Sequence, residues 1–196
     1  MKLNKLMFRE YDIRGIWNED ITEEISYYIG RAYATKLLSL KKNKMIVGYD
    51  NRLSSPIIEK NLVKGLTDGG VDVVRLGLVT TPMYYCAWDK LNIHCGIMIT
   101  ASHNPKEYNG FKMSYNGIHN CFGNEVAELY YIILNGIYSK GNGSITDANI
   151  KEDYIKMINS HINMGSNKLK VIYDCGNGTT SIVAKDIFVS NDNIEY

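Results

Sequence analysis

The sequence predicts an α/β fold, a three-layer α/β/α domain whose mixed, mostly parallel sheet has helices on both faces. Three short apolar runs, at residues 45–49, 71–76 and 95–99, alternate with longer segments in which apolar residues recur at helical spacing. This alternation is typical of strand–helix–strand units, whose parallel strands are joined by right-handed crossovers. A second, incomplete α/β domain is expected to follow.

The first half of the chain contains two clear helix starts. Residues 8–16 read as an extended segment, and Thr22 can then cap a helix whose first turn is acidic, which suits the positive end of the helix dipole. Ser55 followed by Pro56 predicts the cap and the first residue of the next helix, and the glycines at 69–70 are expected to end it. The two helices therefore flank the first buried strand.

The elements that follow make the sheet mixed. Thr81 and Pro82 repeat the cap-plus-proline start for a third helix, and residues 111–115 predict a strand after the third apolar run. The Asn-Gly pair at 116–117 is typical of a tight hairpin turn, so antiparallel pairing is expected here. Residues 126–134 carry apolar side chains at helical spacing and predict one more helix.

A change of composition predicts a domain boundary near residue 140. The stretch 135–144 is rich in Gly, Asn and Ser, and we assign residues 1–140 to the first domain and 141–196 to a linker and the start of a second. The elements expected there are a helix, a strand, a glycine-rich loop and a second helix, at residues 150–162, at 169–174, at 175–178 and from 179 onward. One strand–loop–helix unit cannot bury both faces of a sheet, so this second domain is expected to be incomplete.

Charge and composition argue against several classes of partner. The 196 residues carry a formal net charge of +1, which gives no electrostatic reason to expect nucleic acid or an anionic membrane. No apolar run approaches the roughly 20 residues needed to span a bilayer, and the N-terminus lacks a signal-peptide core. The four cysteines have wide spacings and no C-x-x-C motif, which favours reduced thiols in a cytoplasmic protein. The sequence leaves the oligomeric state open.

The stretch 100–112 concentrates polar and ionisable side chains directly after an apolar run. Its sequence is TASHNPKEYNGFK, and Pro105 keeps Asn104 out of the helical region, so a loop rather than a helix is expected. Ser102 is the candidate nucleophile of this loop. The ordinary alternative for a loop serine is a hydroxyl that bonds the local backbone.

Two chemical uses of Ser102 differ in what they need nearby. A serine hydrolase needs a histidine base, but no G-x-S-x-G motif is present, and on an extended backbone Ser102 and His103 would point to opposite sides. A phosphorylated serine instead needs cations and donors, which Arg14, Arg52, Lys112 and the loop amides can supply. Lys112 also suits general acid–base catalysis. The second use fits these residues better.

A glycine-rich segment, CGNGTTS at residues 175–181, follows an expected strand and precedes an expected helix. A nucleotide-binding loop would have that position, but the third glycine of G-x-G-x-x-G and the lysine of a P-loop are both missing. A tight turn between strand and helix explains the segment better.

Four motifs, in order and at fitting distances, resemble those of the α-D-phosphohexomutase family. They are FREYDIRG at residues 8–15, GYDNRLS at 48–54, TTP at 80–82, and TASHNP followed by YNGFK at 100–112. The first and the last resemble the phosphomannomutase/phosphoglucomutase branch in particular. The segment VIYDCGNG at residues 171–178 is similar to the opening of the family's second domain, so the resemblance covers essentially the whole chain.

This resemblance implies an intramolecular phosphotransferase that interconverts hexose 1-phosphate and hexose 6-phosphate, with mannose, glucose or both as the sugar. Ser102 would be a phosphoserine that forms a hexose 1,6-bisphosphate intermediate and takes back its other phosphoryl group. Lys112 and Arg14 would be the proton-transfer and charge-stabilising partners of the sugar hydroxyl. His103 and Asn104 would shape the surroundings of the phosphoserine.

The resemblance also implies a substrate cleft and a metal ion. Tyr11 would line the cleft, and Arg52 is a further candidate for contact with the hexose phosphate. The family holds Mg²⁺ with an Asp-rich loop, and the phosphate on Ser102 would be the one metal ligand present, because these 196 residues contain no such loop. The alternative expectation is therefore a truncated, catalytically inactive chain that at most binds sugar phosphate.

Overall fold

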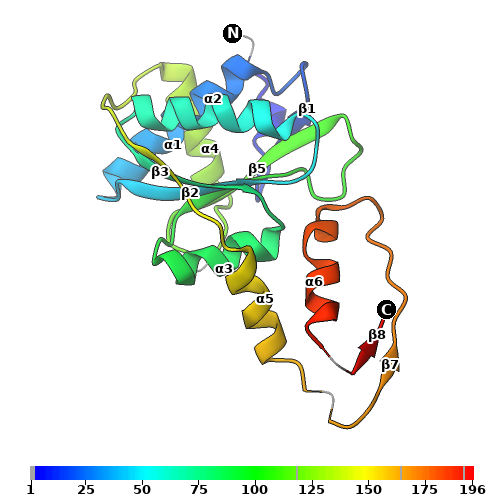
Figure 1. Cartoon of the computed structure of the whole chain (residues 1–196). Helices are drawn as coiled ribbons and strands as arrows, with labels where there is room; N and C mark the ends of the chain where they lie inside the picture. The colour runs from blue at the N-terminus through cyan, green and yellow to red at the C-terminus, as the bar shows by residue number, and fades with distance from the viewer. Residues whose placement is uncertain (1–2, 118, 164, 192) are drawn as a thin grey trace.

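A six-stranded sheet lies at the centre of the computed structural model, which describes residues 3–117, 119–163, 165–191 and 193–196 (Figure 1). The strands are β1 (Ile13–Ile16), β2 (Lys44–Tyr49), β3 (Asp72–Leu78), β4 (Gly96–Ile99), β5 (Tyr108–Ser114) and β6 (Ile145–Asp147). Their spatial order is β1-β5-β4-β2-β3-β6. β4, β2, β3 and β6 are parallel, whereas β5 is antiparallel to both β4 and β1. The predicted mixed sheet is confirmed.

Helices cover both faces of this sheet, which confirms the three-layer α/β/α class (Figure 1). The helices of the first face are α1 (Glu23–Ser39), α2 (Ser55–Asp68) and α4 (Asn124–Asn135), and those of the second are α3 (Thr81–Leu91) and α5 (Lys151–Ser160). Each face has its own apolar core. Ile29 and Leu62 are completely buried in the first core, and Tyr84 is completely buried in the second.

Local sequence determines where the helices begin. The Thr22 hydroxyl accepts a hydrogen bond of 3.2 Å from an amide of the first turn and caps α1 as predicted. The caps of α2 and α3 lie one residue earlier than predicted, at Ser54 and Thr80. Ser55 does not cap α2 because its hydroxyl donates to the buried Asp50 carboxylate, 2.8 Å away. The prolines of both helices occupy the first turn, as expected.

β6 is a strand that the sequence did not predict. It lies beyond the expected domain boundary near residue 140 and pairs in parallel with β3 at the edge of the main sheet. All three of its residues are exposed, so it carries no apolar run that would identify it. The division of the chain into 1–140 and 141–196 stays a prediction.

The turn after β5 also differs from the expectation. Gly117 has a φ of +74°, which suits a tight turn. The described residues between this turn and α4 contain no strand, so the predicted hairpin has no second arm there. β5 obtains its antiparallel neighbours from β1 and β4 instead.

The C-terminal segment carries a second, two-stranded sheet and packs against α3 and α5 through Val183. It contains a 3₁₀ helix (Thr179–Ile182), α6 (Ala184–Val189) and a parallel pair of two-residue strands, β7 (Leu169–Lys170) and β8 (Ile194–Glu195). The strand predicted at residues 169–174 is therefore shorter than expected. Ile172 is 94% exposed, because no described residue covers it.

Two expectations concern the chain as a whole. The four cysteines are free, and burial raises the pKa of the Cys121 thiol to about 12, which makes it a poor nucleophile near neutral pH. Among the described residues, no helix combines the length and apolar character that crossing a membrane requires.

α1 and α2 approach each other through two glycines. A methyl group on Gly65 would lie 2.1 Å from the Tyr27 carbonyl oxygen, and one on Gly30 would lie 2.3 Å from the Leu62 carbonyl oxygen. Both obstacles are backbone atoms, which a rotamer change cannot move aside. The contact fixes the position of α2, whose first residues lie beside the candidate site.

We expect Gly65→Ala to destabilise the protein, although alanine is by about 1 kcal/mol the better helix former. The added methyl group must push the helices apart, and overpacking of this kind costs about 1–3 kcal/mol. Urea unfolding followed by circular dichroism measures the change in the free energy of unfolding. Lys60→Ala, at an exposed position of the same helix, is the control and should change it by less than about 0.5 kcal/mol. A Gly65→Ala variant as stable as the wild type would contradict the close contact.

Candidate active site

An open cleft lies at the carboxyl ends of the parallel strands β2, β3 and β4. Its volume is about 1250 Å³. Ligands of open α/β sheets bind in this position, outside the carboxyl ends of the strands. The loop after β4, which carries Ser102, lines the cleft together with residues 50–54, 79–82 and 177–180. The cleft is therefore the candidate active site.

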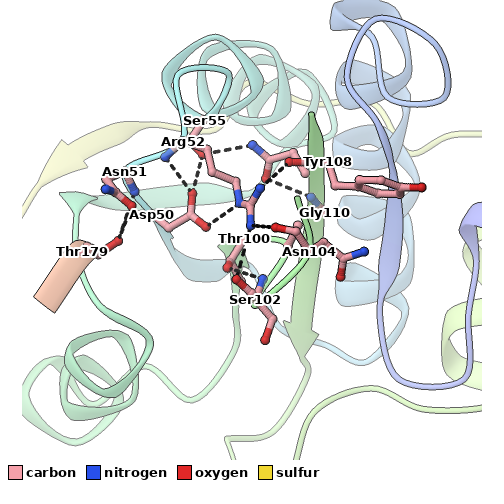
Figure 2. Close-up of polar contacts among 12 residues, drawn as sticks. Asp50, Asn51, Arg52, Ser55, Thr100, Ser102, Asn104, Tyr108, Gly110 and Thr179 are labelled. Atoms are coloured by element: carbon pink, nitrogen blue, oxygen red, sulfur yellow. Dashed lines mark hydrogen bonds and ion pairs between the residues drawn. The ribbon is translucent and has the colours of Figure 1, made fainter. Parts of the chain in front are cut away.

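Ser102 has an unusual backbone conformation at the edge of this cleft. Its φ is +56°, in the left-handed region, which costs a residue other than glycine roughly 1–2 kcal/mol. The backbone amide of Ser102 donates to the Thr100 hydroxyl oxygen at 2.9 Å. Figure 2 shows the Ser102 side chain pointing away from Arg52, and the residue is exposed. The loop thus presents the hydroxyl to solvent in the cleft.

The relation of Ser102 to His103 corrects an expectation. The hydroxyl oxygen lies 3.3 Å from His103 Nδ1, although the two side chains were predicted to diverge. That prediction assumed an extended backbone, and it is wrong because Ser102 is left-handed. His103 lines the cleft beside the serine.

Arg52 lies behind the loop and is fully engaged by it (Figure 2). Its Nη1 donates to the carbonyl oxygens of Pro105 and Tyr108, at 2.6 Å and 3.0 Å. Its Nη2 donates to those of Ser102 and Asn104, at 3.3 Å and 2.7 Å. The side chain is 12% exposed and lines the cleft, but its guanidinium contacts chiefly the backbone of the loop.

Arg14 holds the same loop through different groups. Its Nη1 donates to the Ala101 carbonyl oxygen at 3.2 Å and to the side-chain oxygen of Asn104. Its Nε and Nη2 each lie 2.7 Å from the Asp12 carboxylate. Asn104 therefore joins the two arginines, since its side chain accepts from Arg14 and its carbonyl oxygen accepts from Arg52.

Lys112 lies on the same face of the sheet as Arg14. Ile13 and Phe111, their neighbours in β1 and β5, belong to the core on the α1 side, so the alternation of side chains places Arg14 and Lys112 on the opposite face. Lys112 is half-buried and has no hydrogen-bond or ion-pair partner among the described residues. Tyr11 is 68% exposed and lies outside the residues that line the cleft.

A buried polar network ties Arg52 to the start of α2. One oxygen of the Asp50 carboxylate accepts from the Ser55 hydroxyl at 2.8 Å, and the other lies 3.3 Å from Arg52 Nε. Asn109 of β5 donates to the hydroxyl oxygens of Ser54 and Ser55, at 2.8 Å and 3.0 Å. Asn109 and Ser55 are completely buried, and buried polar groups are costly unless they are paired. The network joins β2, α2 and β5 behind the loop.

The C-terminal segment reaches the rim of the cleft at Asn51. The Asn51 side chain donates to the Asn177 carbonyl oxygen at 2.8 Å, and its backbone amide donates to the Thr179 hydroxyl at 3.1 Å (Figure 2). That hydroxyl in turn donates to the Asn51 side-chain oxygen at 2.9 Å. Residues 175–178 form a tight turn closed by a backbone hydrogen bond of 2.8 Å, in agreement with the turn interpretation.

The residues around Ser102 do not form a metal site by themselves. No group of three or more His, Cys, Asp and Glu side chains that could hold a metal ion occurs in the part of the chain that the structure describes. The two carboxylates that hold the loop's arginines, those of Asp12 and Asp50, are already paired with Arg14 and Arg52. The expected Mg²⁺ site is therefore not assigned to these residues.

The sequence does contain a pattern that indicates the pairing of Asp12 with Arg14 and of Asp50 with Arg52, although it was not used to predict these contacts. Both arginines follow an aspartate by two positions, in Asp12-Ile-Arg14 and in Asp50-Asn-Arg52. In both pairs the carboxylate contacts the guanidinium. Asn109 gave no such signal, because its partners on α2 lie 54 and 55 residues earlier in the chain.

Comparison with protein families gives a match that covers well over half of the chain. Residues 5–136 match the family model described as phosphoglucomutase/phosphomannomutase, alpha/beta/alpha domain I. The matched range contains Ser102, His103, Arg14 and Lys112, together with all strands of the main sheet except β6.

Individual relatives agree with this match. The chain is 41% identical over 182 residues to a phosphomannomutase/phosphoglucomutase of Pseudomonas syringae pv. tomato, covering 92% of the chain and 38% of the relative. It is 38% identical over 184 residues to a phosphoglucomutase of Neisseria meningitidis serogroup B, covering 93% of the chain and 40% of the relative. A crystal structure of a phosphoglucomutase/phosphomannomutase family protein from Burkholderia thailandensis superposes with a TM-score of 0.90 at 31% identity, covering 96% of the chain and 43% of that protein. The chain thus spans about two fifths of the length of these relatives.

We expect Asn109→Ala to lower the free energy of unfolding by about 1–3 kcal/mol. The substitution removes the amide group that donates to two buried hydroxyl oxygens, those of Ser54 and Ser55. Chemical unfolding in urea measures this change. Asn61→Ala is the matched control, since Asn61 makes its hydrogen bonds near the surface of α2, and it should change the free energy by less than about 0.5 kcal/mol. Equal effects of the two substitutions would show that the buried network does not stabilise the fold.

Proposed function

The chain belongs to the phosphoglucomutase/phosphomannomutase family, and on that premise we propose that Ser102 carries a phosphoryl group between the 1- and 6-positions of a hexose phosphate. The observation that supports this proposal most directly is the conformation of the Ser102 loop. An exposed hydroxyl is held at the carboxyl ends of parallel strands, on a backbone that two arginines anchor. In-line phosphoryl transfer depends chiefly on positioning and on neutralising charge.

The proposed reaction conserves atoms and protons in each half. A hydroxyl oxygen of the hexose phosphate attacks the phosphorus of phosphorylated Ser102, and the bond from phosphorus to the serine oxygen breaks as the new bond forms. The hydroxyl proton passes to a base, and the serine oxygen takes up a proton as it leaves. The resulting hexose 1,6-bisphosphate then returns its other phosphoryl group to Ser102 by the same steps in reverse. The product is the isomeric monophosphate.

Four side chains have distinct parts in the proposed reaction. Lys112 is half-buried, has no described partner and is not among the residues that line the cleft, and it would accept the hydroxyl proton and later return it. We assign charge stabilisation to Arg14, which already contacts the loop. His103 lies 3.3 Å from the serine oxygen, where it can exchange the proton of the leaving serine. Asn104 keeps the loop between its two arginines.

The substrate and the metal belong to the same proposal. We propose mannose or glucose phosphate as the substrate, since the names of the relatives include both sugars. Tyr11 would contact it only if the substrate extends beyond the residues that line the cleft. A phosphate on Ser102 offers oxygen atoms of the kind that Mg²⁺ prefers. The described residues supply no carboxylate cluster that would complete such a site.

One contact favours a second candidate, a serine hydrolase. The distance of 3.3 Å from the Ser102 hydroxyl to His103 Nδ1 is close to that of a nucleophile and its base. A triad also needs a third group on the other ring nitrogen, and no described residue hydrogen-bonds there. Covalent labelling of Ser102 by a fluorophosphonate would support this candidate.

We expect the purified chain to gain one phosphate when it is incubated with glucose 1,6-bisphosphate, because Ser102 presents the exposed hydroxyl of the cleft. Intact-mass spectrometry measures the gain. Ser102→Ala should abolish it, whereas Ser160→Ala, which removes an exposed hydroxyl at the end of α5, should leave it unchanged. A phosphate that fragmentation places on another residue would refute the assignment of the nucleophile.

Turnover by the 196-residue chain is a separate expectation. With mannose 1-phosphate or glucose 1-phosphate as substrate, we expect none that a coupled assay detects, because without a metal group among the described residues each transfer is slow, whereas the gain in mass needs only one transfer per chain. Substantial turnover would show that the described residues suffice for catalysis, and it would eliminate the alternative of a catalytically inactive chain. Phosphate uptake without turnover would support that alternative.

A further inference from the structure

We propose that Arg52 is a positioning residue for Ser102 and does not bind the substrate. Its guanidinium holds the backbone of the loop from Ser102 to Tyr108 in the conformation that presents the serine hydroxyl to the cleft. The proposal rests on the proposed function only in treating Ser102 as the nucleophile. The conformational claim stands on the contacts of Arg52 alone.

Both terminal nitrogens of Arg52 are occupied by the loop. A guanidinium has five N–H donors, and four of them are on these two nitrogens. Nη1 and Nη2 make four hydrogen bonds, to the carbonyl oxygens of Ser102, Asn104, Pro105 and Tyr108. The fifth donor is on Nε, which forms an ion pair with the Asp50 carboxylate 3.3 Å away, so neither terminal nitrogen has a donor left for a sugar phosphate. Binding a substrate would require Arg52 to release the loop.

The loop lacks other donors for two of these carbonyl oxygens. Among the backbone hydrogen bonds of the described turns and loops, none has the carbonyl oxygen of Ser102 or Asn104 as its acceptor. Arg52 Nη2 reaches both of them. A carbonyl group that turns inward without a donor is costly, and a charged donor is stronger than a neutral one. Arg52 thus replaces the strand neighbour that the loop lacks.

Arg52 also helps to hold the left-handed backbone of Ser102. Its amide is fixed by the Thr100 hydroxyl and its carbonyl oxygen by Arg52, so both peptide groups of the residue are held. An ordinary residue adopts a φ of +56° only where its surroundings impose it. Without Arg52 the carbonyl side is free to rotate toward an ordinary φ, and the hydroxyl moves with it.

Arg52 is itself held in place by the Asp50 carboxylate. Its Nε lies 3.3 Å from the Asp50 carboxylate, which also accepts from the completely buried Ser55. A lysine at position 52 would keep the charge, but it has three donors on a flexible stem and cannot reproduce the planar fork. Arg52→Lys therefore separates the geometry of the guanidinium from its charge.

Hydrogen–deuterium exchange on the whole 196-residue chain tests the conformational claim. In Arg52→Lys we expect the amides of the peptide spanning residues 100–110 to exchange at least about tenfold faster, which corresponds to about 1.4 kcal/mol. Peptides from α1 and α4 should exchange as in the wild type. Arg75→Lys is the matched control, because Arg75 makes a two-pronged contact with Asp147 at the far edge of the sheet, and it should leave the loop within about twofold of wild type.

A binding measurement distinguishes positioning from substrate contact. The dissociation constant of glucose 1-phosphate, measured by calorimetry, should stay within about threefold of wild type in Arg52→Lys, whereas the rate of phosphate uptake by Ser102 should fall at least about tenfold. Affinity that falls tenfold while loop exchange stays unchanged would overturn the proposal and return Arg52 to the substrate site. If the wild type takes up no phosphate, the proposed function fails, and the exchange experiment still decides the role of Arg52.

A second variant covers the case in which Arg52→Lys does not fold. Asp50→Asn keeps all five guanidinium donors, removes the charge beside Nε and replaces one acceptor oxygen by an NH2 group, so it should raise loop exchange by a smaller factor, about threefold or more. Loop exchange within twofold of wild type in every variant that folds would refute the proposal.

Discussion

The candidate site depends on one constraint: a loop that leaves the end of a parallel strand turns carbonyl groups inward where no strand can pair with them. Arg52 meets this constraint by donating to four carbonyl oxygens from a single planar group. The guanidinium can do this only because Asp50 neutralises and orients it, and Asp50 depends in turn on the first turn of α2. The geometry of an exposed serine is therefore set by a buried salt bridge.

Arg14 and Arg52 both contact the Ser102 loop and both pair with an aspartate, but they bind different groups of the loop. Arg52 is bound to backbone carbonyl oxygens, whereas Arg14 is bound to one carbonyl oxygen and to the side chain of Asn104. A side-chain contact is easier to exchange for a ligand than a set of backbone contacts. This difference is the physical reason for assigning charge stabilisation to Arg14 and positioning to Arg52.

Sequence reasoning was sufficient where the signal was local. Apolar runs, caps and prolines predicted the layers, and the motif around Ser102 predicted the loop in which the cleft, Arg14 and Arg52 meet. It was insufficient where a contact joins distant residues. β6 has no apolar residue pattern, and Asn109 has its partners on α2. The error at Ser102 and His103 came from assuming an ordinary backbone at Ser102, which is left-handed.

The hydrogen bonds around the cleft differ in their access to water. Those that join Asn109 to Ser54 and Ser55, behind the Ser102 loop, are buried, so water competes little for them. At Asn51 the three hydrogen bonds to residues 177–179 are exposed, and water offers each group a partner of similar strength. The first set has the environment of a protein core, and the second has that of a wet interface. A molecule that enters the cleft can therefore compete for the contacts at Asn51 but not for those behind the loop.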